Sequence, residues 1–506
     1  MLSYCQGAYQ KAYDLNGTVE LLGGATGFDK GVIGTGSLQT SYAHISAFLL
    51  KLDSLGNSQW AKKYGDTGSG LTAAYFVCPV NDGGYLFGGQ TNNLVAGATG
   101  FQFFAIKADD TGAVQWAKVY GGMAYGSCNA ATQTADGGYV FTGGVAGAFG
   151  GSDIYLVKTD GQGEILWTKV YGTSTIESAK YIHETSDGGL IIAGYIGNMT
   201  DFLLMKTDSS GNILWANAYG TAAYDELWCA LATTDGGYLL AGTTENSHAG
   251  ISDSYLVKVD SSGLVQWSEQ LSGQWQYGND IVLSLANTGT GNYLLTGAME
   301  DVSNDYVTLF KIDVNGNIVM STALGGQSFA MAGNYVQQLV DGGSIILGYR
   351  GRGTAAFPIK AYAIKSDSTG ASGCNTQNPN FNVINPATVT SPLMLNVSSL
   401  DSSQDVFPFI TTLIPVDSLL CAPDAVTEVP AQPNYSIYPN PTDGIFTVLS
   451  DEELSELVIT NSFGEVVSKT TVQSKAVIDL RGQARGVYFY TLSGKEGIRR
   501  GKIVLQ

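Results

Sequence analysis

Short apolar segments separated by glycine-rich turns run through most of this chain. The copy that begins at Gly220 contains four of them, at 227–231, 238–241, 254–259 and 264–268. Each has the length and the aromatic, aliphatic or β-branched content of a strand. Asp-Gly-Gly follows the first segment and Asp-Ser-Ser-Gly follows the third, and both are turn signals because Gly adopts positive φ and Asp bonds its own backbone. The pattern therefore predicts four antiparallel strands per unit.

This unit recurs seven times. Each copy carries Lys-x-Asp-x-x-Gly, and successive copies are 48 to 56 residues apart, with the aspartates at Asp53, Asp109, Asp160, Asp208, Asp260, Asp313 and Asp367. Repetition at about fifty residues is typical of a propeller or a solenoid. Trp and Tyr-Gly recur in the fourth segment of most copies, which indicates packing between units rather than a ligand site. Most conspicuous residues are thus structural, and function is expected where the copies differ.

The two ends of the array complement each other. Residues 8–14 are similar to the fourth segment of the other units, whereas the seventh unit lacks that segment after Gly370. We expect the N-terminal segment to complete the last unit and close a ring, which removes exposed edge strands. The predicted fold is all-β. A seven-bladed β-propeller spans 1–373, followed by a strand-rich linker at 374–433 and a small Ig-like β-sandwich at 434–506.

The composition excludes several classes of function and partner. The chain has 66 Gly in 506 residues, 14% charged residues and a net charge of −19, which suits an extracellular all-β protein. Without a basic stripe, a nucleic-acid partner is excluded. Three scattered His and no Cys-x-x-Cys argue against a metal site or a Cys/His nucleophile, and we predict no cofactor. The sequence contains no candidate membrane span.

Two cysteines bracket the linker. Cys374 and Cys421 flank a segment rich in Ser, Thr and Pro, and we expect them to form a disulfide. The other cysteines in strand-like segments are interpreted as small buried hydrophobes.

The last 73 residues carry a family resemblance. Seven short alternating segments favour a small β-sandwich there. Its marked positions are Tyr438, Pro439, Asn440, Pro441 and Gly444, then Gly486, Val487 and Tyr488, and finally Lys502. These residues resemble the type A C-terminal sorting domain of the type IX secretion system, over the whole domain.

That resemblance has several implications. It implies a Bacteroidota protein that is secreted or held on the outer cell surface. Its partners would be the type IX secretion machinery and the sortase-like peptidase that removes such domains. Export of this kind needs a leader, and residues 1–8 are too short for one and lack its charged and apolar regions. We therefore expect the true start to lie upstream, or the leader to have been removed.

The repeats resemble known propeller families more loosely. They are similar to the Asp-Gly-Gly-Tyr propeller repeats of surface proteins that carry this sorting domain, to the tryptophan-docking motif of quinoprotein propellers, and to kelch repeats. A quinoprotein dehydrogenase would be implied by the second likeness, but the adjacent cysteines that some members use are missing here. All three likenesses imply a propeller, and none fixes an activity.

Our first functional hypothesis is a binding protein for an extracellular glycan, a protein or matrix. The tight turns share one face of the predicted ring, so the variable loops share the other. Aromatic rings in these loops stack on sugars or anchor protein partners. The candidates are Tyr125, Tyr224, Trp275, Tyr277 and Phe329. Packing between blades is the alternative for each of them.

The second hypothesis is a polysaccharide-acting hydrolase. Such enzymes need two converging carboxylates. Glu177, Asp225 and Asp280 occupy comparable places in adjacent units and would ring the mouth of a central channel. The alternative is that they bond the backbone of the neighbouring blade, and a cation at this ring, with calcium as the candidate, is a third possibility. The Asp-Ser-Ser-Gly-Asn loop at Asp208 faintly resembles a calcium loop, but it lacks alternating carboxylates and is interpreted as a turn.

Overall fold

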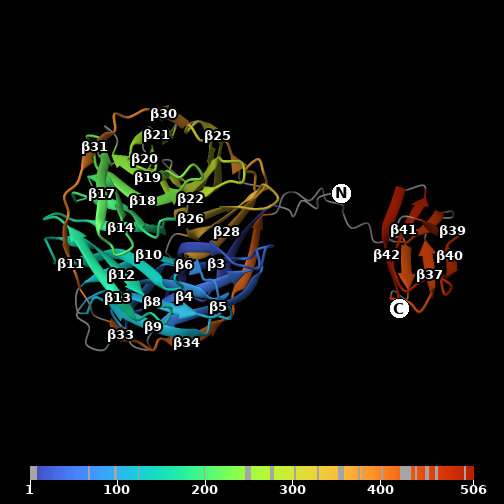
Figure 1. Cartoon of the computed structure of the whole chain (residues 1–506). Coiled ribbons are helices and arrows are strands. Elements are labelled where there is room, and N and C mark those ends of the chain that lie inside the picture. Colours follow the sequence, from blue (N-terminus) through green and yellow to red (C-terminus); the bar gives the residue numbers. More distant parts are fainter. Residues whose placement is uncertain are drawn as a thin grey trace. The chain divides into compact units, whose positions relative to one another are not determined.

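The computed structural model divides into two compact units, Met1–Pro423 and Asp424–Gln506, which are described separately (Figure 1). It describes residues 8–65, 69–95, 100–122, 125–198, 200–245, 252–273, 279–300, 304–327, 330–351, 358–373, 376–379, 381–400, 403–421, 435–438, 441–450, 455–461, 465–494 and 497–506. Within these ranges every regular element is a β-strand, and no helix is long and apolar enough to span a membrane.

Among the described residues, the first unit contains seven four-stranded antiparallel groups that are consistent with propeller blades, and one further strand extends each group (Figure 1). A short parallel pairing of His44 and Ile45 with Gly70 and Leu71 joins two of the groups into one ten-stranded sheet. We call these four-stranded groups blades 1 to 7. Blade 1 contains β2 (Thr18–Thr26), β3 (Val32–Ser41), β4 (His44–Leu52) and β5 (Ser58–Gly65). Blade 2 contains β6 (Gly70–Pro79), β7 (Tyr85–Thr91), β8 (Gln102–Ala108) and β9 (Val114–Tyr120). Blade 3 contains β10 (Gly126–Gln133), β11 (Tyr139–Ala146), β12 (Ser152–Thr159) and β13 (Ile165–Gly172).

The remaining blades follow in chain order. Blade 4 contains β14 (Ser178–Glu184), β15 (Leu190–Ile196), β16 (Asp201–Thr207) and β17 (Ile213–Gly220). Blade 5 contains β18 (Asp225–Ala232), β19 (Tyr238–Glu245), β20 (Ser252–Val259) and β21 (Val265–Gly273). Blade 6 contains β22 (Asp280–Asn287), β23 (Tyr293–Glu300), β24 (Asp305–Ile312) and β25 (Ile318–Gln327). Blade 7 contains β26 (Ala330–Gln338), β27 (Ser344–Gly351), β28 (Lys360–Ser366) and β1 (Tyr9–Asp14).

The N-terminal strand completes the last blade, as the sequence predicts. β1 pairs antiparallel with β28, with Tyr9 opposite Lys365 and Tyr13 opposite Ala361. The Tyr13 hydroxyl donates a hydrogen bond of 2.6 Å to the Gly56 carbonyl in blade 1, so blade 7 is joined to the first blade of the chain.

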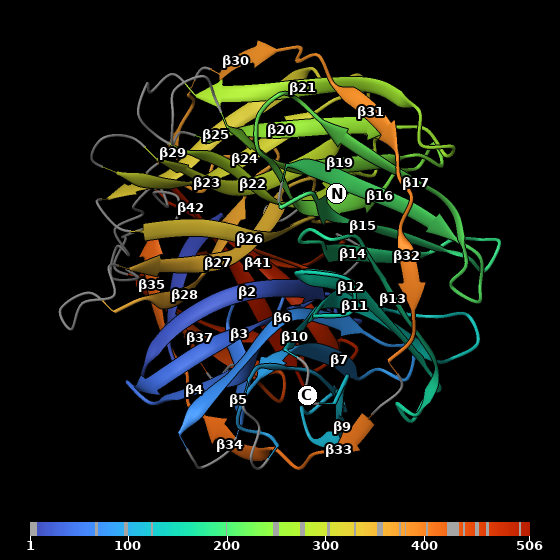
Figure 2. The same cartoon turned by 90° about the vertical axis from the view of Figure 1, so that its left-hand side faces the viewer.

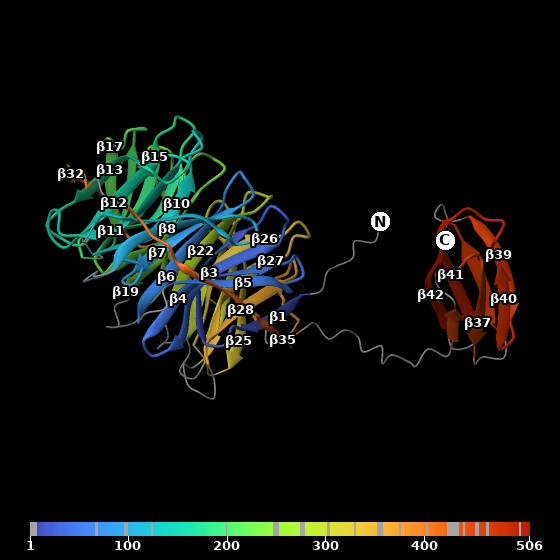
Figure 3. The same ribbon diagram turned by 90° about the horizontal axis from the view of Figure 1, so that it is seen from below.

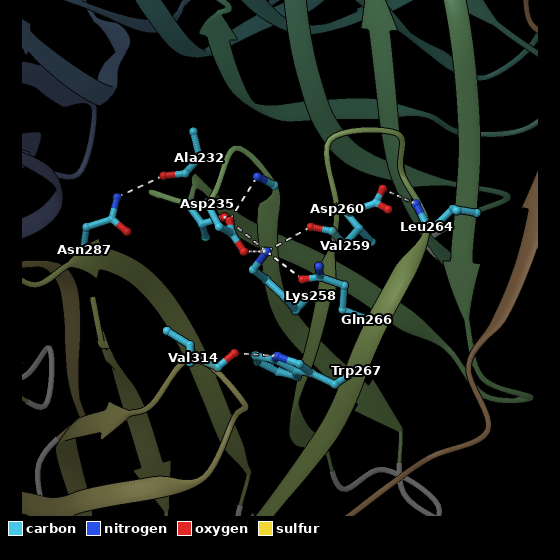
Figure 4. Close-up of polar contacts among 12 residues, drawn as sticks. Ala232, Asp235, Lys258, Val259, Asp260, Leu264, Gln266, Trp267, Asn287 and Val314 are labelled. Carbon is cyan, nitrogen blue, oxygen red and sulfur yellow. Dashed lines mark hydrogen bonds and ion pairs between the residues drawn. The ribbon is translucent and has the colours of Figure 1, made fainter. Parts of the chain in front are cut away.

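The two turn motifs of a blade bond to each other. In blade 5 the buried ammonium of Lys258, from Lys-x-Asp-x-x-Gly, lies 2.9 Å from the Asp235 carboxylate of Asp-Gly-Gly (Figure 4). Burial alone would raise the pKa of Asp235, but hydrogen bonds from Thr233 and Lys258 lower it to about 2. The equivalent pairs recur at Lys51–Asp29, Lys107–Asp82, Lys158–Asp136, Lys206–Asp187 and Lys365–Asp341.

Neighbouring blades are joined by the recurring aromatic residues. The Tyr of each Tyr-Gly pair donates its hydroxyl proton to the carbonyl of the motif Gly in the next blade, for instance from Tyr64 to Gly112 at 2.7 Å. These motif glycines have φ between 72° and 89°, a conformation that disfavours any side chain. Trp267 likewise donates its indole N–H to the Val314 carbonyl of blade 6 (Figure 4). The regular aromatics are thus packing residues.

The segment that follows the last blade forms a belt around the first unit. Its strands pair antiparallel with the outermost strand of one blade after another, in the reverse of chain order. The partners are β29 (Thr376–Gln377) with β25, β30 (Phe381–Ile384) with β21, β31 (Val389–Pro392) with β17, β32 (Asn396–Ser398) with β13, β33 (Ser403–Asp405) with β9, β34 (Phe409–Leu413) with β5, and β35 (Val416–Cys421) with β1. Figure 2 shows these strands in orange along the rim. The sequence predicted a strand-rich linker here but not its partners.

Side chains as well as backbone hold the belt in place. Asp405 accepts a charged hydrogen bond of 2.6 Å from Lys118, and Asp417 accepts from both the backbone N–H and the hydroxyl of Ser58. Val406 is 4% exposed within the core of blades 1 and 2, whereas the next residue, Phe407, is 92% exposed. The belt is therefore docked on one side and covers the sheet edges that the blades would otherwise expose.

The second unit consists of two small sheets. One contains β36 (Tyr435–Tyr438), β37 (Ile445–Ser450) and β40 (Lys475–Asp479), and the other β39 (Val466–Val472), β38 (Ser455–Thr460), β41 (Gly486–Gly494) and β42 (Gly497–Leu505). Their strands are red in Figure 3. Phe446 and Val448 from the first sheet share one buried cluster with Leu457 and Tyr488 from the second.

Because the belt is docked on one side, substitutions at two adjacent belt residues should have different effects on the free energy of unfolding. Val406→Ala should lower the free energy of unfolding by about 1–2 kcal/mol, because it leaves a cavity between belt and blades. Phe407→Ala, the matched control, should change it by less than about 0.5 kcal/mol. Urea denaturation of both variants measures the difference. Equal effects would contradict a docked belt.

Candidate functional site

A cavity of about 620 Å³ lies where the first strands of the blades face one another. In each first strand the pairing with the second strand shifts by one residue, leaving one residue as a β-bulge. All seven bulge residues line the cavity: Leu22, Tyr75, Asn129, Lys180, Trp228, Leu283 and Asn334. β-Bulges redirect side chains and are common beside functional sites. We call this set the bulge ring.

The bulge ring is the part of the repeat that varies. Every member lies seven positions before the turn residue equivalent to the Asp of Asp-Gly-Gly, as Trp228 lies before Asp235. The position is constant while the residue changes between apolar, aromatic, amide and cationic. The sequence pattern placed the variation in the loops and did not reveal this ring. One feature of the sequence could have revealed it. The position seven residues before the turn is the same in every copy, but its residue type differs between copies.

Two members of the bulge ring hold the blades together. The Asn129 amide donates to the Ala179 carbonyl of blade 4 at 2.8 Å, and the Asn334 amide donates to the Leu21 carbonyl of blade 1 at 2.6 Å. The second bond also links the last blade to the first. These amides therefore fix the shape of the cavity.

Lys180 and Trp228 form the polar, aromatic wall of the cavity. The Lys180 ammonium lies 5.2 Å from the centre of the Trp228 ring and 5.7 Å from that of Tyr195. Burial lowers the pKa of Lys180, and the negative charge of Glu226 opposes this shift. The indole N–H of Trp228 is buried and lacks a hydrogen-bond partner among the described residues. A buried donor of this kind is unusual in a folded protein.

Of the aromatic candidates in the loops, two lie in the described part of the chain. Tyr125 is 54% exposed and Tyr224 is 56% exposed. Tyr224 lines a shallow hollow of about 280 Å³ together with Glu226 and Glu245. Trp275, Tyr277 and Phe329 lie outside the described residues.

The three candidate carboxylates lie at the starts of blades and are buried. Glu177 and Asp225 are 0% exposed and Asp280 is 4% exposed. Glu177 accepts hydrogen bonds from the backbone N–H and hydroxyl of Thr173, and Asp225 accepts the same pair from Thr221. These contacts favour a role in holding the loops between blades.

Asp280 differs from an ordinary carboxylate in its pKa. Burial, with the nearby charges of Asp253 and Glu300, raises the pKa of Asp280 from 3.8 to about 7, although the Gly273 N–H donates to its Oδ2 at 2.6 Å and opposes the shift. The folded protein thus favours the protonated acid.

The remaining site predictions concern metals and the disulfide. Asp208 accepts from the backbone N–H groups of Ser210 and Asn212, so its loop is a closed turn. Among the described residues, no group of three or more His, Cys, Asp or Glu converges as metal ligands. Cys374 and the side chain of Cys421 lie outside the described residues, so the disulfide remains a prediction.

In the second unit the turn that contains Pro441 and Gly444 is bonded to the last strand through Thr442. The Thr442 N–H donates to the Val504 carbonyl, and the Gln506 N–H donates back to the Thr442 carbonyl, both at 2.9 Å. Gly444 has a φ of 117°. Tyr488 is 4% exposed in the core, while Lys502 is exposed on β42. Pro439 and Asn440 lie outside the described residues.

Comparison with known proteins identifies this second unit. Residues 436–506 match the family model of the secretion system C-terminal sorting domain. The chain therefore carries a type IX C-terminal sorting domain. This domain indicates secretion or placement on the outer surface, and it implies an interaction with the type IX secretion machinery.

Other similarities are partial or weak. β-Agarase A of Zobellia galactanivorans is 41% identical over 81 residues, which span 15% of this chain and 15% of the agarase. The structure of PorZ, an essential surface component of the type IX secretion system of Porphyromonas gingivalis, is 10% identical with a TM-score of 0.22, covering 98% of this chain and 100% of that one. The extracellular domain of BT4673 from B. thetaiotaomicron is 9% identical with a TM-score of 0.19, covering 96% and 74%. Scores this low support no inference.

The pKa of Asp280 predicts how stability depends on pH. Between about pH 4 and about pH 7 the folded state binds a proton that the unfolded state has lost, so this group makes stability fall as pH rises. Asp280→Asn is neutral at every pH and keeps an acceptor for the Gly273 N–H, so its stability should fall less over this range. Urea denaturation at about pH 5 and about pH 8 tests this.

The control for this experiment is Asp110→Asn, because Asp110 is exposed. It should keep the wild-type dependence on pH. The prediction is refuted if Asp280→Asn and the wild type lose the same stability between the two pH values.

Proposed function

We propose that this chain is a secreted or cell-surface binding protein, built as a closed seven-bladed β-propeller with an Ig-like β-sandwich as its sorting domain. The central cavity is its ligand site, and an extracellular glycan is the ligand class. The bulge ring carries this proposal, because a rigid scaffold there displays one side chain from each blade, and these side chains are of five residue types. Cavities of this size are typical of small-ligand sites.

The lining favours a glycan. Tyr75, Phe76, Tyr181 and Tyr335 line the cavity with aromatic surface, and Trp228 adds a donor that has no partner in the described part of the chain. Sugars present both apolar ring faces and hydroxyl groups, so rings with a few polar groups recognise them well.

A hydrolase is supported less well. Its catalytic carboxylates would have to reach the substrate. Glu177 and Asp225 have 0% exposure and bond Thr173 and Thr221. Binding without catalysis therefore accounts better for these contacts.

Export follows from the sorting domain. We propose that the folded chain leaves the cell through the type IX machinery, and that a sortase-like peptidase then removes residues of the second unit. The first unit then remains as the working part.

A glycan array with the full chain tests the binding site. Wild type should bind at least one glycan, and Trp228→Ala should weaken that binding at least about tenfold, because the aromatic ring that lines the cavity there is lost. Tyr42→Ala, the control, removes a fully exposed ring outside the cavity and should have no effect.

Two further variants distinguish the cavity from the loops. If Tyr125→Ala and Tyr224→Ala abolish binding while Trp228→Ala does not, the ligand binds the loop face instead. Failure of the wild type to bind any glycan would refute the glycan ligand.

A further inference from the structure

We propose that the Lys180–Trp228 wall of the cavity binds the negatively charged group of an acidic sugar, a carboxylate or a sulfate ester. This inference rests on the proposed function and specifies its ligand. The wall is formed by adjacent blades, since Lys180 is the bulge residue of β14 and Trp228 that of β18.

Lys180 is half-buried and differs from the buried lysines of the blades. Lys107, Lys258 and Lys365 each form an ion pair of 2.8 to 3.0 Å with the Asp of their own blade. Within the described part of the chain, Lys180 has no carboxylate inside ion-pair distance. Its ammonium instead lies over the rings of Trp228 and Tyr195. The ring contacts compensate the charge only in part, because cation–π attraction is weaker than a close ion pair.

The charges around the Lys180 ammonium leave it without a close counter-charge among the described residues. Glu226 is the acidic residue that acts on it, and burial raises the pKa of Glu226 itself. Burial thus disfavours both the Lys180 ammonium and the Glu226 carboxylate. A bound anion at the ammonium would supply the close counter-charge that Glu226 does not.

A second hydrogen-bond donor lies beside the Lys180 ammonium. The unpartnered indole N–H of Trp228 belongs to the same ring that faces Lys180. A singly charged oxyanion has enough acceptor positions for an ammonium and an additional N–H donor. The single positive charge of Lys180, which Glu226 opposes, is a better match for a ligand with one negative charge than for a doubly charged phosphate.

The rest of the cavity lining suits the body of a sugar. Leu22 and Leu283 are the apolar members of the bulge ring, and Tyr75 and Tyr335 add ring surface to the lining. A ligand that fills the cavity therefore needs an apolar face as well as an anionic end. An acidic sugar residue has both.

Calorimetric titration of the full chain tests this inference. The probes are a uronic-acid oligosaccharide, a sulfated oligosaccharide and a neutral oligosaccharide of equal length. Wild type should bind at least one acidic probe about tenfold more tightly than the neutral one, as expected for one partly desolvated ion contact. Added salt should weaken the acidic binding and leave the neutral binding unchanged.

Substitutions then locate the contact. Lys180→Met keeps an unbranched apolar chain against the rings and should remove the preference for acidic probes, while Lys180→Arg should retain it. Lys62→Met is the matched control, because Lys62 also lies over a Trp ring, at 6.0 Å from Trp60, but lies outside the cavity. Thermal melts of each variant confirm folding.

The outcomes separate the two proposals. Equal affinity of the wild type for acidic and neutral probes, or equal loss of both in Lys180→Met, overturns the acidic-sugar inference and leaves the glycan-binding proposal intact. Absence of binding to all three probes overturns the acidic-sugar inference, whereas only absence of binding on the whole glycan array overturns the glycan-binding proposal.

Discussion

The closure of the ring by β1 is the constraint on which the first unit depends. Blade 7 obtains its fourth strand, β1, from the N-terminal part of the first unit. Tyr13 and Asn334 of blade 7 then donate hydrogen bonds to backbone carbonyls of blade 1. Only a closed ring brings seven first strands around one cavity. A missing fourth strand in blade 7 would leave an open sheet edge and would remove the bond from Tyr13 to blade 1.

Local chemistry made much of this fold predictable. The motif turns, the four-strand unit and the closure by residues 8–14 follow from short patterns such as the Gly56 turn and the Tyr-Gly pairs. The bond between Lys258 and Asp235 was not predicted, although both residues were conspicuous, because the pattern does not show which turns meet. Their pairing explains why both motifs recur in most blades.

The bulge ring and the belt escaped prediction for a different physical reason. A bulge depends on the register between two strands, which the sequence around Trp228 does not display. The belt strands are short, and Val406 is one of the few belt residues with a buried apolar side chain. Their partners are up to several hundred residues away in the chain. Carboxylates such as Asp225 attracted attention by their spacing, yet their hydrogen bonds are within the loops.

The belt changes how unfolding spreads through the molecule. In an ordinary repeat array each unit contacts only its neighbours, so one end can unravel while the rest stays folded. Here a single segment passes every blade once and ends on β35, beside the strand that closes the ring. Loss of any blade would therefore release part of a structure that all the others share. We expect the first unit to unfold as one cooperative body rather than blade by blade, so that partly folded rings are scarce.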